Sequence, residues 1–237
     1  MLKERLLDAM YLCKAAYDYK KVPGKELITD SFETQFFKSN TDFGFIEINH
    51  LLEQINFVIR GTRGWCAWKE NFDVIDEEEK SKKEGRIHDG FHEGWISLLK
   101  EGMFQKLKDL IREYPDYELS GQGHSRGAPV IENAVYDLYA DIGKKFDNVY
   151  TFAGPRAGGK RFAAFMEDNF NHFRVIIPMD PVINVPPRFL GYTHIDKNVV
   201  SLDKPSYKWL KWIPSRIVKA LICHRPEDYI EAIQKSI

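Results

Sequence analysis

The stretch from residue 117 to residue 177 alternates between two kinds of segment, and this alternation limits the fold more than any other feature. Three runs are strand-like, namely "YELSG", "NVYTFAG" and "FRVII". Two helix-like segments, with apolar residues at helical spacing, lie between them: "APVIENAVYDLYADI" and "KRFAAFMEDNF". Strands that alternate with helices in this way predict a mostly parallel central sheet flanked by helices, which is an α/β fold.

The segments upstream extend this arrangement. Residues 2–19 and 96–114 carry apolar residues near helical spacing, so we expect a helix in each. "DFGFIEIN" at 42–49 and "QINFVIRG" at 54–61 are typical of two paired strands joined by a short turn. No repeat, linker or low-complexity tract divides the chain, and we therefore expect a single domain over residues 1–237.

Composition and charge argue against several classes of partner. The formal net charge is −1, so there is no electrostatic basis for binding nucleic acid. No run approaches the roughly 18 apolar residues of a transmembrane segment. The three cysteines are far apart and lack the spacing of metal ligands. We expect neither a metal nor a cofactor.

The first twenty residues bear on location. Glu4, Arg5 and Asp8 interrupt the apolar run that a secretory signal needs. The odd number of widely spaced cysteines is typical of reduced thiols. From these two features we expect a cytoplasmic protein.

A Gly-x-Ser-x-Gly pattern stands where the strand-like "YELSG" gives way to a helix-like segment. Residues 123–127 read Gly-His-Ser-Arg-Gly. The chain must turn sharply there, and the two glycines leave room for the turn. The Ser125 hydroxyl would then stand at the carboxyl end of a strand, where the first amides of the next helix favour negative charge. The pattern indicates a nucleophile. The alternative is a glycine-rich turn with an idle serine.

A nucleophilic serine needs a histidine base and an acid that orients it. In sheets of this kind the chain order is serine, acid, histidine. Asp180 comes three residues after the apolar run of "FRVII", and Pro181 keeps that segment a loop. Two histidines follow Asp180. We favour His224, which directly precedes the helix start "RPEDYIEAI", and His194 in "GYTHID" remains the alternative.

Seven stretches of the sequence follow one another in the order found in a known protein family. They are "FVIRGTRGWCAWKENF", "IHDGFHEGW", "GHSRGAPV", "TFAGPRAGGKRFAAF", "RVIIPMDPVINVPP", and "GYTHID" with "HRPEDYIEAI". Together they resemble the class 3 lipases, the fungal-type triacylglycerol lipases of the α/β-hydrolase superfamily. The resemblance implies an α/β-hydrolase fold and a catalytic triad of Ser125, Asp180 and His224 that forms an acyl-enzyme.

The resemblance also assigns supporting roles. It implies an oxyanion hole made by Thr62 and the backbone amide of Arg126, with structural roles for His194 and His88. The chain departs from the family at the turn, because the family usually has leucine where Arg126 stands. The donor there is a backbone amide, so the arginine side chain need not remove it and instead changes the local shape or charge.

The implied substrate is a carboxylic ester of a lipid, such as an acylglycerol, met through transient contact with a lipid interface. Trp65, Trp68 and Phe72 recur at helical spacing after Thr62, where the family carries a mobile lid that contacts substrate. Ordinary core packing is the alternative for this stripe. Residues 209–222 are apolar with interspersed lysine and arginine. They could line an acyl pocket or contact a lipid surface, and core packing is again the alternative. A soluble carboxylesterase or a phospholipase on the same fold remains open.

Two other functions are weaker alternatives. "AGPRAGGKR" has the glycine and lysine spacing of a nucleotide-binding P-loop, but Arg161 stands where a serine or threonine must bind Mg²⁺. A catalytically silent binding protein on a hydrolase fold is the other alternative. All three triad positions carry chemically competent residues, which argues against it.

Overall fold

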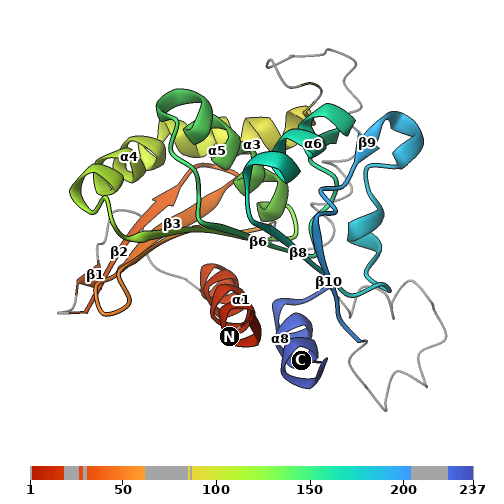
Figure 1. The fold of residues 1–237 in the computed structure, drawn as a ribbon, viewed down its shortest axis with the longest axis horizontal. Helices are drawn as coiled ribbons and strands as arrows, with labels where there is room; N and C mark the ends of the chain where they lie inside the picture. The colour runs from red at the N-terminus through yellow and green to blue at the C-terminus, as the bar shows by residue number, and fades with distance from the viewer. Residues whose placement is uncertain are drawn as a thin grey trace.

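The computed structural model describes residues 2–18, 27–28, 31–61, 85, 87–203 and 224–236. Its centre is an eight-stranded sheet of order β1-β2-β3-β4-β5-β6-β8-β10 (Figure 1). The strands are β1 Leu27–Ile28, β2 Phe32–Lys38, β3 Phe43–Asn49, β4 Gln54–Ile59, β5 Glu118–His124, β6 Asn148–Phe152, β8 His172–Ile176 and β10 Asn198–Ser201. A separate two-stranded sheet pairs β7 Gly158–Gly159 with β9 Tyr192–Thr193.

The sheet has an antiparallel part and a parallel part. Strands β1 to β4 pair antiparallel, whereas β4, β5, β6, β8 and β10 pair parallel. The strands expected from the alternating segments are β5, β6 and β8, and the expected hairpin is β3 with β4. The prediction of a mostly parallel central sheet flanked by helices is therefore confirmed. Strands β2 and β10 lengthen it beyond what the sequence indicated.

Helices cover both faces of the sheet. The first helix, α1 (Leu2–Asp18), and the last, α8 (Pro226–Ser236), pack side by side on one face (Figure 1). The other face carries α3 Asp89–Lys100, α4 Met103–Glu113, α5 Gly127–Ile142 and α6 Lys160–Asn169. Two short 3₁₀ turns, η1 Pro181–Asn184 and η2 Arg188–Leu190, follow β8.

The helix expected over 96–114 is two helices, which corrects that prediction. Helix α3 ends at Lys100 and α4 begins at Met103, with Gly102 between them at φ +83°. Glycine adopts this left-handed conformation without the steric cost that other residues meet, so the chain can turn there. Apolar spacing continues across the break, and for that reason the periodicity did not reveal it.

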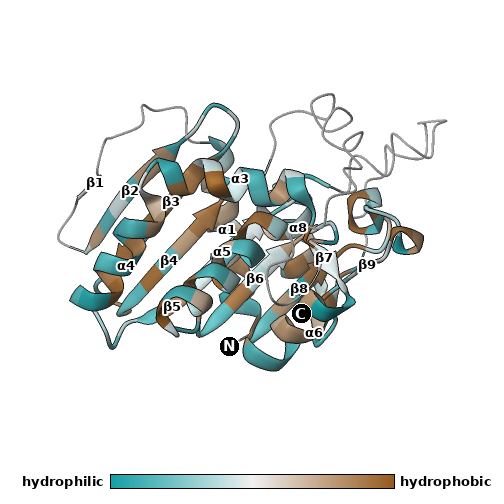
Figure 2. Cartoon of the chain, turned by 90° about the horizontal axis from the view of Figure 1, so that it is seen from above, coloured by the Kyte–Doolittle hydropathy of each residue, from teal (hydrophilic) through white to brown (hydrophobic). Residues whose placement is uncertain are grey.

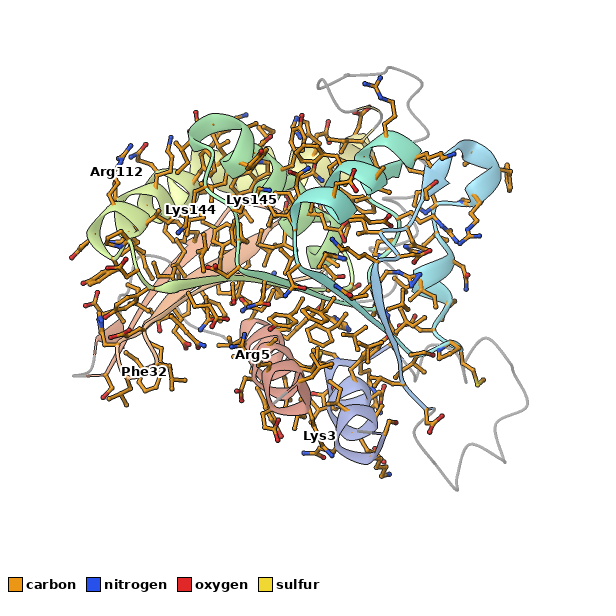
Figure 3. All side chains as sticks on the ribbon, viewed as in Figure 1. Lys3, Arg5, Phe32, Arg112, Lys144 and Lys145 are labelled. Carbon is orange, nitrogen blue, oxygen red and sulfur yellow. The ribbon has the colours of Figure 1, made fainter. Side chains whose placement is uncertain are left out.

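Side chains fill the space on both sides of the sheet (Figure 3). One buried cluster includes Phe57 and Trp95 and lies between the sheet and α3 to α6. A second cluster includes Met10 and Tyr229 and lies under α1 and α8. Figure 2 shows both apolar and hydrophilic residues along α4, as an amphipathic helix at a surface has. These two cores hold the carboxyl ends of the parallel strands in place.

Within the described ranges, no helix combines the length and the apolar character needed to cross a bilayer. The same part of the chain holds no cluster of three or more His, Cys, Asp or Glu side chains that could bind a metal ion.

Candidate active site

Ser125 occupies a strained turn between β5 and α5. Its φ is +58°, in the left-handed region that residues other than glycine rarely adopt. The amide of Ser125 donates to the carbonyl oxygen of Phe152 at 2.9 Å, which ties the turn to the end of β6. Such a conformation persists only where the surroundings enforce it, and it raises the Ser125 hydroxyl above the carboxyl ends of the parallel strands.

The two glycines of the turn are required by close backbone approach. A Cβ added to Gly123 would lie 2.4 Å from the carbonyl oxygen of Gly127. One added to Gly127 would lie 2.2 Å from the carbonyl oxygen of Ile59, at the end of β4. Gly61 is equally constrained, because its Cβ would lie 2.8 Å from that of Ser125. The steric reason for the Gly-x-Ser-x-Gly pattern is therefore confirmed.

The histidine that the structure places beside Ser125 is His224. Its Nε2 lies 2.8 Å from the Ser125 Oγ, and its Nδ1 lies 2.8 Å from Oδ2 of Asp180. In the neutral tautomer that fits these partners, Nδ1–H donates to the carboxylate and Nε2 accepts from the serine hydroxyl. Three side chains that are distant in sequence thus form one hydrogen-bonded chain.

Asp180 is fully buried, and its oxygens all find donors. It precedes η1, where Oδ1 accepts from the amide of Val182 at 2.9 Å. Oδ2 accepts from the hydroxyl of Tyr229 at 3.0 Å as well as from His224. Tyr229 in turn accepts from the amide of Ile177 at 3.1 Å. A buried carboxylate is costly unless it is hydrogen-bonded, and these contacts satisfy it and fix its direction.

His124, the residue before the serine, points away from the hydroxyl. Its Nδ1 lies 2.9 Å from the hydroxyl of Tyr17 in α1, and its ring centroid is 5.0 Å from that of His224. Burial lowers the pKa of His124 well below its ordinary range, and nearby His224 lowers it further. His124 therefore stays neutral and places no second positive charge beside His224.

His194, the alternative base, lies apart from this chain of hydrogen bonds. Its Nε2 donates to the carbonyl oxygen of Ile183 at 2.6 Å, and the side chain is buried. Burial lowers the pKa of His194 to about 3, and nearby Arg174 contributes in the same direction. The geometry thus separates the two candidate histidines. His88, also assigned a structural role, stacks on Phe91 with ring centroids 4.4 Å apart.

We expect stability to fall on acidification because of His194. In the unfolded chain a histidine binds a proton as the pH drops below about 6.5, whereas folded His194 stays neutral down to a pH of about 3. Its contribution is complete above pH 6.5 and is lost as the pH falls through this window. The slope approaches ~1.4 kcal/mol per pH unit for one such histidine.

The measurement is the free energy of unfolding between pH 7 and pH 5, above the range where carboxylates titrate. His194→Gln cannot titrate but can still donate to Ile183, so its slope should be shallower than that of the unchanged protein. His124 remains in both proteins and leaves a residual slope. Equal slopes would contradict the assignment.

Several sequence-based expectations fall outside the described residues. These are the oxyanion residue Thr62, the stripe of Trp65, Trp68 and Phe72, and residues 209–222. Arg126, the other expected oxyanion donor, directly precedes α5, so its amide belongs to the amino end of that helix. An amide in this position favours a nearby negative charge.

The sequence did not single out two contacts of the site. The first is the hydrogen bond from Tyr229 to Asp180. It could have been expected, because a tyrosine on the inner face of a helix needs a polar partner for its hydroxyl. The guanidinium of Arg126 pairs with Asp42, a residue 84 positions away. No local pattern indicated that pair.

Comparisons with known proteins identify the family of the chain. The family model described as Lipase (class 3) matches residues 56–190. A secreted mono- and diacylglycerol lipase A of Penicillium cyclopium is 28% identical over 152 residues, which is 64% of this chain and 49% of the relative. A lipase of Rhizopus niveus is 26% identical over 179 residues, covering 74% of this chain and 44% of that protein.

A solved structure shows the same fold. The crystal structure of a lipase from Rhizopus microsporus var. chinensis aligns with a TM-score of 0.71 at 24% identity, over 86% of this chain and 74% of the other. The chain spans about half the length of the Penicillium and Rhizopus niveus relatives.

The expected cytoplasmic location is contradicted, because the Penicillium cyclopium relative is a secreted protein. That expectation relied on the charges of Glu4, Arg5 and Asp8. These residues belong to α1, which packs against the sheet and α8. The charge of Arg5 joins this helix to the sheet, because Arg5 pairs with Glu118 in β5.

Proposed function

The chain belongs to the class 3 lipase family, and on that premise we propose that it is a serine hydrolase that cleaves carboxylic ester bonds of lipids. The observation that carries the proposal is the hydrogen-bonded chain from Asp180 through His224 to Ser125. It ends on a serine whose left-handed backbone aims the hydroxyl out of the turn. We further propose one domain over residues 1–237, built on the eight-stranded sheet.

In the proposed reaction His224 takes the proton of Ser125 as Oγ attacks the ester carbonyl. Asp180 holds the imidazole in the tautomer with Nδ1–H and stabilises the positive ring that forms. The protonated Nε2 then gives its proton to the leaving alcohol. Water attacks the acyl-enzyme by the same route, which releases the acid and restores Ser125.

The tetrahedral intermediate carries a negative oxygen that needs donors. We propose the amide of Arg126 as one donor, because it belongs to the amino end of α5 and amides there favour a negative charge. Thr62 is the second donor that the family resemblance implies, and it stays a prediction. The same holds for the stripe of Trp65, Trp68 and Phe72 as a lid.

Exposed apolar side chains beside the acid loop support a lipid substrate over a soluble ester. Phe189 in η2 is 86% exposed, and Met179, next to Asp180, is 42% exposed. An exposed large aromatic ring costs free energy in water and is stabilised when it enters a lipid surface. We propose that this protein works at a lipid interface outside the cell, as a secreted lipase does.

The test is hydrolysis of p-nitrophenyl esters of increasing acyl length, below and above their solubility limits. We expect the rate to rise once the ester forms an emulsion. Phe189→Ser should diminish that rise and leave the hydrolysis of a dissolved short ester unchanged, because the residue contacts the interface and not the reacting atoms. Leu52→Ser, which changes an exposed side chain in the β3–β4 turn, is the matched control.

The outcomes separate the candidate functions. A rate that follows the dissolved ester concentration, with no rise at the interface, would identify a soluble carboxylesterase on this fold. Preferential release of fatty acid from phospholipid vesicles over acylglycerol emulsions would identify a phospholipase. Absence of hydrolysis together with absence of labelling by a fluorophosphonate would contradict the proposed function.

A further inference from the structure

The side chain of Arg126 is bound to two elements that lie far from it in sequence. One guanidinium nitrogen, Nη1, donates to Oδ1 of Asp42, which directly precedes β3. The other, Nη2, donates to the carbonyl oxygen of Gly90 in the first turn of α3 at 3.0 Å. The residue whose backbone amide is the proposed oxyanion donor is therefore fixed at its far end to two other elements.

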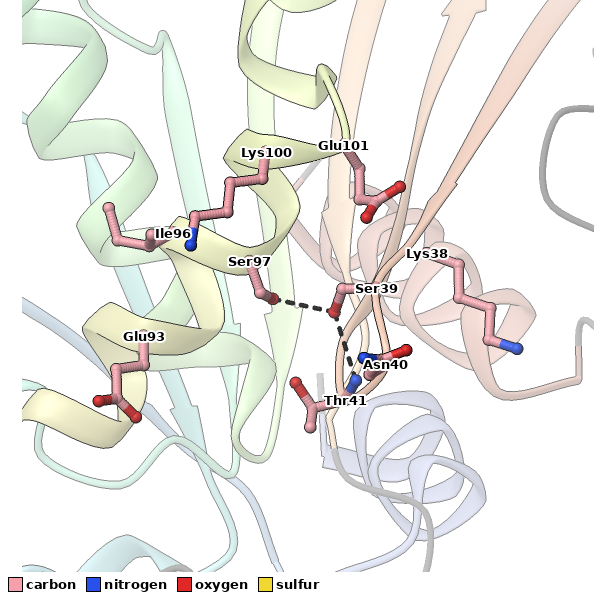
Figure 4. Close-up of a pocket in the computed structure, with 9 residues that line it drawn as sticks. All are labelled: Lys38, Ser39, Asn40, Thr41, Glu93, Ile96, Ser97, Lys100 and Glu101. Carbon is pink, nitrogen blue, oxygen red and sulfur yellow. Dashed lines mark hydrogen bonds between the residues drawn. The ribbon is translucent and has the colours of Figure 1, made fainter.

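Asp42 is buried, and its second oxygen is also occupied. Oδ2 accepts from the hydroxyl of Thr41 at 2.6 Å and from the hydroxyl of Ser97 in α3 at 3.1 Å. Thr41 and Ser97 also line a polar groove of about 740 Å³ between α3 and the turn that joins β2 to β3 (Figure 4). The two hydroxyls stand between Asp42 and the groove, so water screens the ion pair less than it screens a surface pair.

Gly94 supplies the space that the guanidinium occupies. It lies inside α3, where glycine lowers helix stability relative to alanine. A Cβ at this position would lie 2.7 Å from Nη2 of Arg126 and 3.1 Å from Oδ1 of Asp42. The unfavourable helix residue, the buried carboxylate and the arginine thus form one matched arrangement.

We propose that Asp42 and Arg126 act as positioning residues for ester hydrolysis, holding the Arg126 backbone amide where it receives the oxyanion. The inference rests on the proposed function. A donor stabilises an oxyanion only when it is already placed within hydrogen-bond distance of where the charge develops. The side chain of Arg126 provides this placement by joining the turn at Ser125 to the start of β3 and the start of α3.

If the guanidinium acted only through its charge, the expected effect of Asp42→Asn on the rate would be opposite to that expected from positioning. Asp42→Asn keeps the arginine charge and removes its compensating anion, so a positive field at the oxyanion would grow and the reaction would accelerate. Arg126→Gln would slow it. If the pair instead positions the amide, both variants break the same Asp42–Arg126 interaction, and both slow the reaction. The double variant is then no slower than either single variant.

The first experiment measures kcat and KM on a dissolved short ester, together with the rate at which a fluorophosphonate labels Ser125. Loss of a whole oxyanion donor lowers kcat ~100- to 1000-fold, so a displaced donor should lower it about tenfold. KM should change little, because the tie acts on the transition state. Arg126→Lys keeps the charge but cannot bind both Asp42 and the carbonyl oxygen of Gly90. We therefore expect its kcat to lie between those of Arg126→Gln and the unchanged protein.

The second experiment uses Gly94→Ala, which keeps both charges and improves a helix residue. The new methyl group displaces the guanidinium, which lies at the end of a flexible side chain. The better helix residue offsets part of the cost of separating the buried pair, and folded Gly94→Ala should react about tenfold more slowly. This variant decides the question even where neither polar variant folds. Leu107→Ala, in the core under α4, is the control for lost stability and should keep kcat.

Three results would overturn the inference. They are an unchanged labelling rate in folded Gly94→Ala, a faster rate in Asp42→Asn, and additive losses in the double variant. Failure of the proposed function looks different, since the unchanged protein would then neither hydrolyse esters nor react with the fluorophosphonate.

Discussion

Ser125→Ala is expected to lower kcat for ester hydrolysis by a factor on the order of 10⁶, as loss of the nucleophile does in other serine hydrolases. The attacking Oγ is the acceptor of the acyl group, and nothing else at the turn can replace it. Binding and the oxyanion donors remain, so a small residual rate above the uncatalysed reaction should persist. The variant should also lose labelling by a fluorophosphonate.

Ser125→Gly provides a matched control for the fold. Both variants lack the nucleophile, but glycine adopts the φ of +58° without the cost that alanine meets. We expect Ser125→Gly to exceed Ser125→Ala in unfolding free energy by about 1 kcal/mol, with equal loss of activity. Equal stabilities would contradict the strain at the turn. Near-normal turnover by either folded variant would exclude Ser125 as the nucleophile.

His224→Ala is expected to produce a loss of activity close to that of Ser125→Ala, because a nucleophile and its base act as a unit. Without the imidazole the Ser125 hydroxyl keeps its proton at neutral pH and attacks poorly. Combined with Ser125→Ala, the second substitution should add almost nothing. Single-turnover and steady-state rates on the same ester measure both effects.

His194→Ala is the control for this prediction. It removes a buried ring and leaves the Ile183 carbonyl oxygen without its donor, which costs about 1–3 kcal/mol of unfolding free energy from the lost hydrogen bond alone. The kcat per folded molecule should stay close to that of the unchanged protein. If His194→Ala lost activity and His224→Ala kept it, the two roles would be exchanged.

Local features of the sequence were enough to indicate the fold around the nucleophile. Strand-like and helix-like periodicities belong to single segments, so β5, α5, β6, α6 and β8 could be predicted from residues 117–177 alone. The need for glycine on both sides of Ser125 could also be predicted locally. A sharp strand-to-helix turn brings backbone atoms so close that a side chain there would clash. The place of Asp180 just past a strand-like run indicated the acid, and chain order then narrowed the base to two histidines.

Which distant side chains meet depends on how the elements pack together. His194 and His224 both follow Asp180, and the packing of α8 beside α1 brings His224 and Tyr229 onto the carboxylate. The pairing of Asp42 with Arg126 depends on how β3 and α3 approach the turn, and Gly94 permits it. Periodicity describes one element at a time, whereas these contacts depend on the distances between elements, which the two hydrophobic cores set together.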